Sequence, residues 1–164
     1  MKVKKTITIK KPAAEVWNII AHEFDQAYVW MGPIPHSYEI GERNSSVGAP
    51  MDGRICLLTE KPDGPRVREL ITQYDEAGKS LTFSVESIDV PAFVPLKSNL
   101  VQMTVKPVDQ NTSEVLWVAQ PKIKPFAYLL YPLLMLGLPR AFGNLLAGLK
   151  KHAEAAPNKL ASVA

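Results

Sequence analysis

The chain has 164 residues, which is enough for one domain that buries a core without disulfides or structural metals. Hydrophobic residues make up 46% and charged residues 21%, the composition of a soluble globular protein. The net charge of +3 is small and the lysines are scattered, which argues against a nucleic-acid partner. The single cysteine excludes an intrachain disulfide, and no apolar signal core follows Met1, so we expect a cytoplasmic protein.

The first forty residues predict a strand followed by two helices. Residues 3–9 alternate polar and apolar side chains, as a half-buried strand does. Pro12 suits a first helical turn, and Val16, Trp17 and Ile20 share one face, which predicts a helix of three turns over 11–22. A second short helix is predicted over 24–30, ended by Gly32 and Pro33.

The middle of the chain predicts an antiparallel meander. Turn signals rich in Gly, Pro, Asp and Asn separate short runs with strand composition. The predicted strands cover residues 37–41, 53–60, 67–74, 80–86, 101–108 and 114–119.

The C-terminal stretch predicts a long amphipathic helix that starts at Pro139 and ends before Pro157. Its apolar residues recur at helical spacing on one stripe, which is typical of a helix packed against an apolar surface. The stripe contains Leu138, Phe142, Leu145, Leu146, Leu149 and Ala153.

Residues 126–138, which we call the apolar lobe, carry no charge and are broken by Pro132 and Gly137. Thirteen residues are fewer than the roughly 20 that a membrane span needs, so a short helix buried in a helix pair is favoured. Lys122, Lys124 and Arg140 flank the lobe as basic residues flank an interfacial segment. Three roles stay open: a gate that touches a membrane surface, ordinary core, or the interface of a homodimer.

One strand, two short helices, about six more strands and one long helix define an α+β layout, in which a curved sheet of about seven strands wraps around the last helix and leaves a cavity. This layout resembles the helix-grip superfamily of START, Bet v 1-like, polyketide cyclase and plant hormone-receptor domains, also called SRPBCC. The resemblance is carried by the run 9–17, Trp30 and Ile34, Gly48, Arg54 and Leu58, Glu69, Leu70 and Asp75, the run 81–84, Val115 and Trp117, and Leu149, Lys150 and Glu154. It implies a single domain over 1–156, followed by a flexible tail at 157–164. The apolar lobe and two prolines, Pro91 and Pro95, depart from the family pattern.

Residues that share an inward face follow from the period of two along strands and from the helix stripe. The predicted ligand-binding set is Arg54, Cys56, Leu58, Glu69, Ile71, Phe83, Val85, Val101, Met103, Trp117, Phe142 and Leu146. For each apolar member, an ordinary place in the core is the alternative.

Arg54 and Glu69 are charged residues on otherwise apolar strand faces. Burying a charge is costly unless it is paired, so a salt bridge between them would explain both. The functional alternatives are that they orient a polar group of a ligand, or that Glu69 is a general acid or base.

Two function classes follow from the resemblance. One is the binding or transport of a hydrophobic small molecule, such as a lipid, a sterol-like compound or an aromatic polyketide. The other is a cyclase or dehydratase in which Glu69, Arg54, His36 or Tyr38 moves protons. Binding is favoured because Arg54 cannot donate a proton at ordinary pH. No cofactor is expected, and His22, His36, His152 and Cys56 lack metal-ligand spacing.

Overall fold

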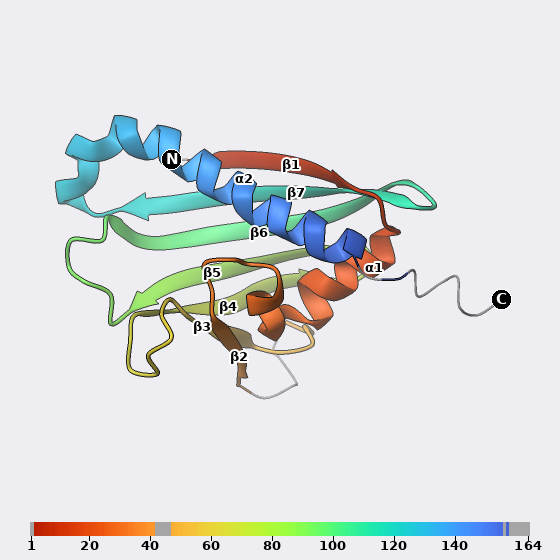
Figure 1. The fold of residues 1–164 in the computed structure, drawn as a ribbon, viewed down its shortest axis with the longest axis horizontal. Coiled ribbons are helices and arrows are strands. Elements are labelled where there is room, and N and C mark those ends of the chain that lie inside the picture. Colours follow the sequence, from red (N-terminus) through yellow and green to blue (C-terminus); the bar gives the residue numbers. More distant parts are fainter. Residues whose placement is uncertain (1, 42–46, 156, 158–164) are drawn as a thin grey trace.

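A seven-stranded antiparallel sheet forms the body of the protein (Figure 1). The computed structural model describes residues 2–41, 47–155 and 157. The order of strands across the sheet is β1-β7-β6-β5-β4-β3-β2, so the predicted meander is present and β1 is added beside its last strand. The strands are β1 (Val3–Ile9), β2 (His36–Ile40), β3 (Gly53–Leu57), β4 (Arg66–Asp75), β5 (Ser80–Ile88), β6 (Leu96–Asp109) and β7 (Thr112–Ile123).

Strands β6 and β7 are longer than the sequence predicts. β6 begins at Leu96, five residues before the predicted start at Val101, and β7 continues to Ile123. The two extensions pair with each other, with Leu96 opposite Ile123 and Asn99 opposite Pro121. This mutual pairing satisfies the backbone hydrogen bonds of a segment in which the alternation of apolar residues is weak.

The helix predicted over 11–22 is divided. It consists of α1 (Ala13–Trp17) and a π-helical turn, η1 (Asn18–His22). The amide of Glu23 donates to the carbonyl of Asn18 at 2.9 Å, a spacing of five residues that widens the helix. The Asn18 side chain also donates to the Glu23 carboxylate at 2.7 Å, so local polar contacts hold the wide turn. The predicted second helix is present as the 3-10 segment η2 (Phe24–Val29).

The C-terminal helix does not begin at Pro139 as predicted. The helix α2 runs from Tyr131 to Ala155, and the 3-10 segment η3 (Pro125–Leu130) precedes it. Pro132 lies in the first turn of α2, where its missing N–H has no partner to lose. Pro139 lies inside the helix and removes only the bond to the carbonyl of Met135.

Helix α2 lies against one face of the sheet, as in the helix-grip arrangement (Figure 1). Four of its side chains, Phe142, Leu146, Leu149 and Ala153, are buried in the core. The helix approaches the backbone at Trp30 so closely that a Cβ atom added to Gly148 would lie 2.3 Å from the Trp30 carbonyl oxygen. The tail predicted at 157–164 lies outside the described residues, apart from Pro157.

Candidate functional site: a cavity between sheet and helix

A cavity of about 1090 Å³ lies between the sheet, the segment 29–34 and helix α2. Its volume is comparable with the upper end of small-molecule sites in proteins. The sheet contributes Glu69, Phe83, Val85, Leu96, Asn99, Val101 and Trp117, and the helix contributes Ala141, Phe142, Asn144, Leu145, Gly148, Lys151, His152 and Ala155. Most of the wall is therefore apolar, with a few polar groups set into it.

Aromatic rings form a continuous part of the wall. Phe83 meets Trp117 edge to face, with ring centroids 6.5 Å apart, and Trp117 stacks on Phe142 at 5.9 Å. Such rings offer a large, rigid apolar surface to a bound molecule.

Arg54 and Glu69 form the predicted ion pair. They lie opposite each other on β3 and β4, and Glu69 Oε2 accepts from Arg54 Nε at 2.6 Å and lies 2.5 Å from Nη2. Both side chains are buried, with 1% of Arg54 and 7% of Glu69 exposed. Arg54 Nη1 also donates to the Phe24 carbonyl at 2.5 Å, and the guanidinium lies 3.9 Å from the centroid of the Phe24 ring. The pair therefore connects η2 to the sheet.

The two polar residues that the sheet contributes to the wall, Glu69 and Asn99, fall on one row of the sheet. Glu69 pairs with Val85, and Val85 pairs with Asn99 on the next strand. Of the buried side-chain polar atoms without a hydrogen-bond partner in the described part of the chain, three belong to residues that line the cavity: Trp30 Nε1, Asn99 Oδ1 and Trp117 Nε1. Buried polar groups in proteins are normally hydrogen-bonded, so three such atoms in the residues of one cavity wall are unusual.

Six of the twelve predicted ligand-binding residues line the cavity: Glu69, Phe83, Val85, Val101, Trp117 and Phe142. Five others, Arg54, Cys56, Ile71, Met103 and Leu146, are buried but do not line it. Leu58 does not face inward as predicted, because β3 ends at Leu57 and the Leu58 amide instead bonds to the Pro65 carbonyl in the following turn. Its side chain is 38% exposed.

The polar candidates on β2 lie away from the cavity. His36 and Tyr38 are exposed and are absent from its wall, and His36 Nε2 lies 3.3 Å from a Glu60 carboxylate oxygen. Cys56 is fully buried, and burial raises the pKa of its thiol to about 12, although the charge of Arg54 acts in the opposite direction. Cys56 therefore has the environment of a small hydrophobic residue rather than a nucleophile.

Much of the wall was not in the predicted ligand-binding set: Leu96 and Asn99 on the sheet, the segment 29–34, and seven residues of α2. Asn99 shares the inward face of β6 with Val101 and Met103 at a spacing of two, but the predicted strand began after it. Extending that alternation backward by one step would have identified it. The segment 29–34 belongs to the wall because it lies beside α2, and no periodic pattern in the sequence predicts that position.

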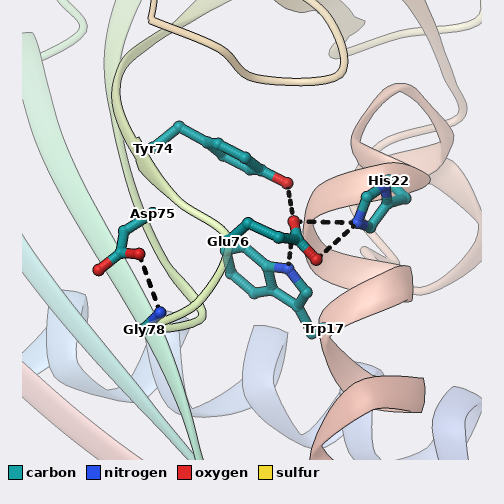
Figure 2. A network of polar contacts seen from close by, with 6 residues as sticks. All are labelled: Trp17, His22, Tyr74, Asp75, Glu76 and Gly78. Carbon is teal, nitrogen blue, oxygen red and sulfur yellow. Dashed lines mark hydrogen bonds and ion pairs between the residues drawn. The ribbon is translucent and has the colours of Figure 1, made fainter.

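A second polar cluster lies outside the cavity wall and ties the first helices to the turn after β4. Figure 2 shows Glu76 receiving contacts from Trp17, His22 and Tyr74. Trp17 Nε1 donates at 3.0 Å, and His22 Nε2 lies 3.2 Å from the same carboxylate oxygen. Partial desolvation raises the pKa of Glu76, but the hydrogen bonds from Tyr74, Trp17 and His22 outweigh it and lower the pKa to about 2. None of these four residues lines the cavity, so the cluster has a structural role: it holds α1 and η1 to the end of β4.

The apolar lobe is exposed, and the expectation that it packs in a buried helix pair is wrong. Its exposed side chains are Phe126, Tyr128, Leu129, Leu130, Tyr131, Leu133, Met135 and Leu136, with Leu129 at 91%. Because the helix continues through the prolines, Pro125–Ala155 is the one stretch of the described residues with the length and hydropathy of a membrane-spanning helix, by those two criteria alone. Only 6% of its most apolar window is buried.

The loop between β5 and β6 lies beside the lobe. Lys124 joins them, since its amide donates to the Pro95 carbonyl at 2.8 Å and its Nζ donates to the Ala92 carbonyl at 3.2 Å. Phe93, in the same loop, is also exposed. The lobe and this loop form one apolar end of the molecule.

Comparisons with known proteins agree with this architecture. Residues 1–154 match the model of a family described as polyketide cyclase / dehydrase and lipid transport. No curated protein matches the chain.

Several solved structures share the fold. An aromatase/cyclase named Zhui from a Streptomyces species superposes with a TM-score of 0.71 at 10% identity, over 94% of this chain and 93% of that one. A START superfamily protein from Mycobacterium smegmatis gives 0.64 at 12% identity, over 94% of each chain. The protein Ara h 8.0201 gives 0.70 at 14% identity, over 95% of this chain and 99% of that one. At these identities the likeness shows the fold alone.

Proposed function

Because the chain belongs to the polyketide cyclase/dehydrase and lipid-transport family, we propose that it is a cytoplasmic protein that binds and carries a hydrophobic small molecule in the cavity. A lipid, a sterol-like compound or an aromatic polyketide would suit the wall. The observation that carries the proposal is a cavity of about 1090 Å³ walled mainly by apolar and aromatic side chains.

Binding is favoured over cyclase chemistry by the position of the candidate proton carriers. His36 and Tyr38 lie outside the cavity wall, and Arg54 is buried behind it. Of the four residues suggested for proton transfer, Glu69 alone lines the cavity, and its carboxylate is held by Arg54.

Narrowing the cavity should weaken binding. Val85 lines the cavity and is only half-buried, so Val85→Phe is expected to place a ring in the space that a ligand would occupy. Overpacking of about 1–3 kcal/mol corresponds to a loss of affinity of roughly 5- to 150-fold. The measurement is titration with the fluorescent apolar probe anilinonaphthalene sulfonate, together with native mass spectrometry of any ligand that co-purifies.

The matched control is Val108→Phe, because Val108 is an exposed valine on β6 that does not line the cavity. It should bind the probe as the wild type does. Equal binding by wild type, Val85→Phe and Val108→Phe would place the probe elsewhere and contradict the proposal.

We further propose that the apolar lobe contacts a membrane surface when the ligand is exchanged. The exposed apolar side chains lie between the basic residues Lys122, Lys124 and Arg140, which would meet anionic headgroups. The same helix continues from the lobe into the cavity wall at Ala141 and Phe142. Docking of the lobe would therefore bring the cavity close to the lipid.

Charge placed on the lobe should prevent this contact. Leu129→Glu and Leu136→Glu alter highly exposed side chains, so the fold should be unaffected while co-sedimentation with phosphatidylcholine vesicles falls. Adding phosphatidylglycerol to the vesicles should strengthen wild-type binding. The control is Val108→Glu, an equal charge change outside the lobe. A different outcome is that the wild type binds neither kind of vesicle and forms a dimer that Leu129→Glu dissociates. The lobe would then be a homodimer interface.

A further inference from the structure

Glu69 and Asn99 line the cavity with hydrogen-bonding capacity that the protein itself does not use. Both contacts from Arg54 end on Glu69 Oε2, and no hydrogen bond from the described residues reaches Oε1. Asn99 is 6% exposed, and its Oδ1 has no partner within the described ranges. Glu69 therefore has an unused oxygen on the wall, and Asn99 Oδ1, which has less than 1 Å² of accessible surface, becomes available when its amide turns toward a ligand.

The register of the sheet fixes how far apart these groups are. Glu69 on β4 pairs with Val85 on β5, which pairs with Asn99 on β6. Two strand spacings separate their backbones by about 10 Å, and the apolar Val85 lies between them on the same wall. A complementary molecule carries polar groups at both ends of an apolar skeleton of about that length.

The chemistry of Glu69 decides which polar group fits. An ionised carboxylate only accepts hydrogen bonds, and Arg54 already balances its charge, so the complementary group is a neutral donor rather than a second cation. A ligand carboxylate would be repelled. An amide both donates and accepts, so Asn99 can bind a hydroxyl or a carbonyl.

We propose that Glu69, Val85 and Asn99 form a hydroxyl-recognition row, which selects an apolar ligand with a hydroxyl over Glu69 and a second oxygen over Asn99. This inference rests on the proposed binding function and adds the class of ligand. An anionic lipid has a different place to bind, because Lys151 and His152 line the cavity on the last turns of α2. The test therefore separates the row from these two residues.

The probe is estradiol, whose hydroxyls stand at opposite ends of a rigid apolar skeleton, compared with its dimethyl ether, which keeps the skeleton but has no donor. Affinities come from calorimetry and from displacement of anilinonaphthalene sulfonate. A hydrogen bond to a charged acceptor corresponds to roughly a tenfold or greater preference for the diol. Equal affinity for diol and ether would overturn the row while hydrophobic binding stands. Failure of both steroids to displace a bound probe would also overturn the row, and failure of the probe to bind would overturn the proposed function.

The variant Asn99→Leu tests whether Asn99 binds the ligand or only supports the fold, because the two roles predict different affinities for the two steroids. Leucine has a similar volume and removes a buried amide without a partner, so the melting temperature should rise. Affinity for estradiol should fall about tenfold while affinity for the dimethyl ether is unchanged. Equal changes for both steroids would contradict the row. Tighter binding of palmitate than of estradiol, with the difference removed by Lys151→Ala, would show that an anionic head group at Lys151 governs selection.

Discussion

Replacing Arg54 by Met is expected to lower the free energy of unfolding by about 3–5 kcal/mol, because it leaves the buried carboxylate of Glu69 without its cation. The substitution also removes the contact of the guanidinium with the Phe24 ring and its hydrogen bond to the Phe24 carbonyl. Glu69→Leu should be similarly damaging, since it leaves Arg54 unpaired. Chemical denaturation followed by tryptophan fluorescence measures both losses.

The double variant Arg54→Met/Glu69→Leu distinguishes a buried pair from a surface pair. With both charges gone, the loss should be smaller than for either single variant, because neither desolvated charge remains. If the free energy of unfolding falls by less than about 1 kcal/mol in all three variants, the ion pair behaves as an exposed one, which would contradict the burial of Arg54 and Glu69.

The substitution Gly148→Ala should destabilise the protein by about 2–3 kcal/mol, although alanine is the better helix former. A methyl group at this position would lie 2.3 Å from the Trp30 carbonyl oxygen, so the helix or the 29–34 segment must move. Both elements line the cavity, and the movement should change ligand affinity as well as stability. Thermal unfolding and probe titration report the two effects.

The same helix offers a matched control in Gly143. No atom outside its immediate surroundings lies within 4 Å of an added Cβ, so Gly143→Ala should gain the helix propensity of alanine, about 0.5–1 kcal/mol. Opposite signs for the two variants are expected. A gain in stability for both would show that α2 does not press on the backbone at Trp30.

The sheet and the Arg54–Glu69 pair could be predicted from sequence because both follow from local rules. Alternation fixes which strand residues share a face, and the short turn at 61–65 fixes that β3 and β4 are neighbours. Together these place Arg54 opposite Glu69. The family resemblance added the order of strands and the position of the final helix.

The parts that could not be predicted depend on contacts remote in sequence. The alternation with Val101 and Met103 indicates the face that Asn99 would take, but whether the strand reaches Asn99 depends on β7, which extends far enough to pair with it. The predicted start of α2 was wrong because Pro139 suits a first helical turn. In the structure Pro139 lies inside the helix, where it removes one backbone hydrogen bond. For the apolar lobe, composition alone could not decide whether anything covers it.

The pairing of β1 with β7 has a consequence for synthesis on the ribosome. Val3 lies opposite Ala119 and Ile9 opposite Ser113, so among the described strands β1 has its one partner in the last of them along the chain. Until β7 is made, the apolar side chains of β1 are unprotected, and the long-range closure is the slow, entropically costly part of folding. Lys150 Nζ also donates to the Thr8 carbonyl and the Lys10 amide donates to Glu154, so the last helix secures the first strand. Nascent chains that stall before β7 should therefore depend on chaperones.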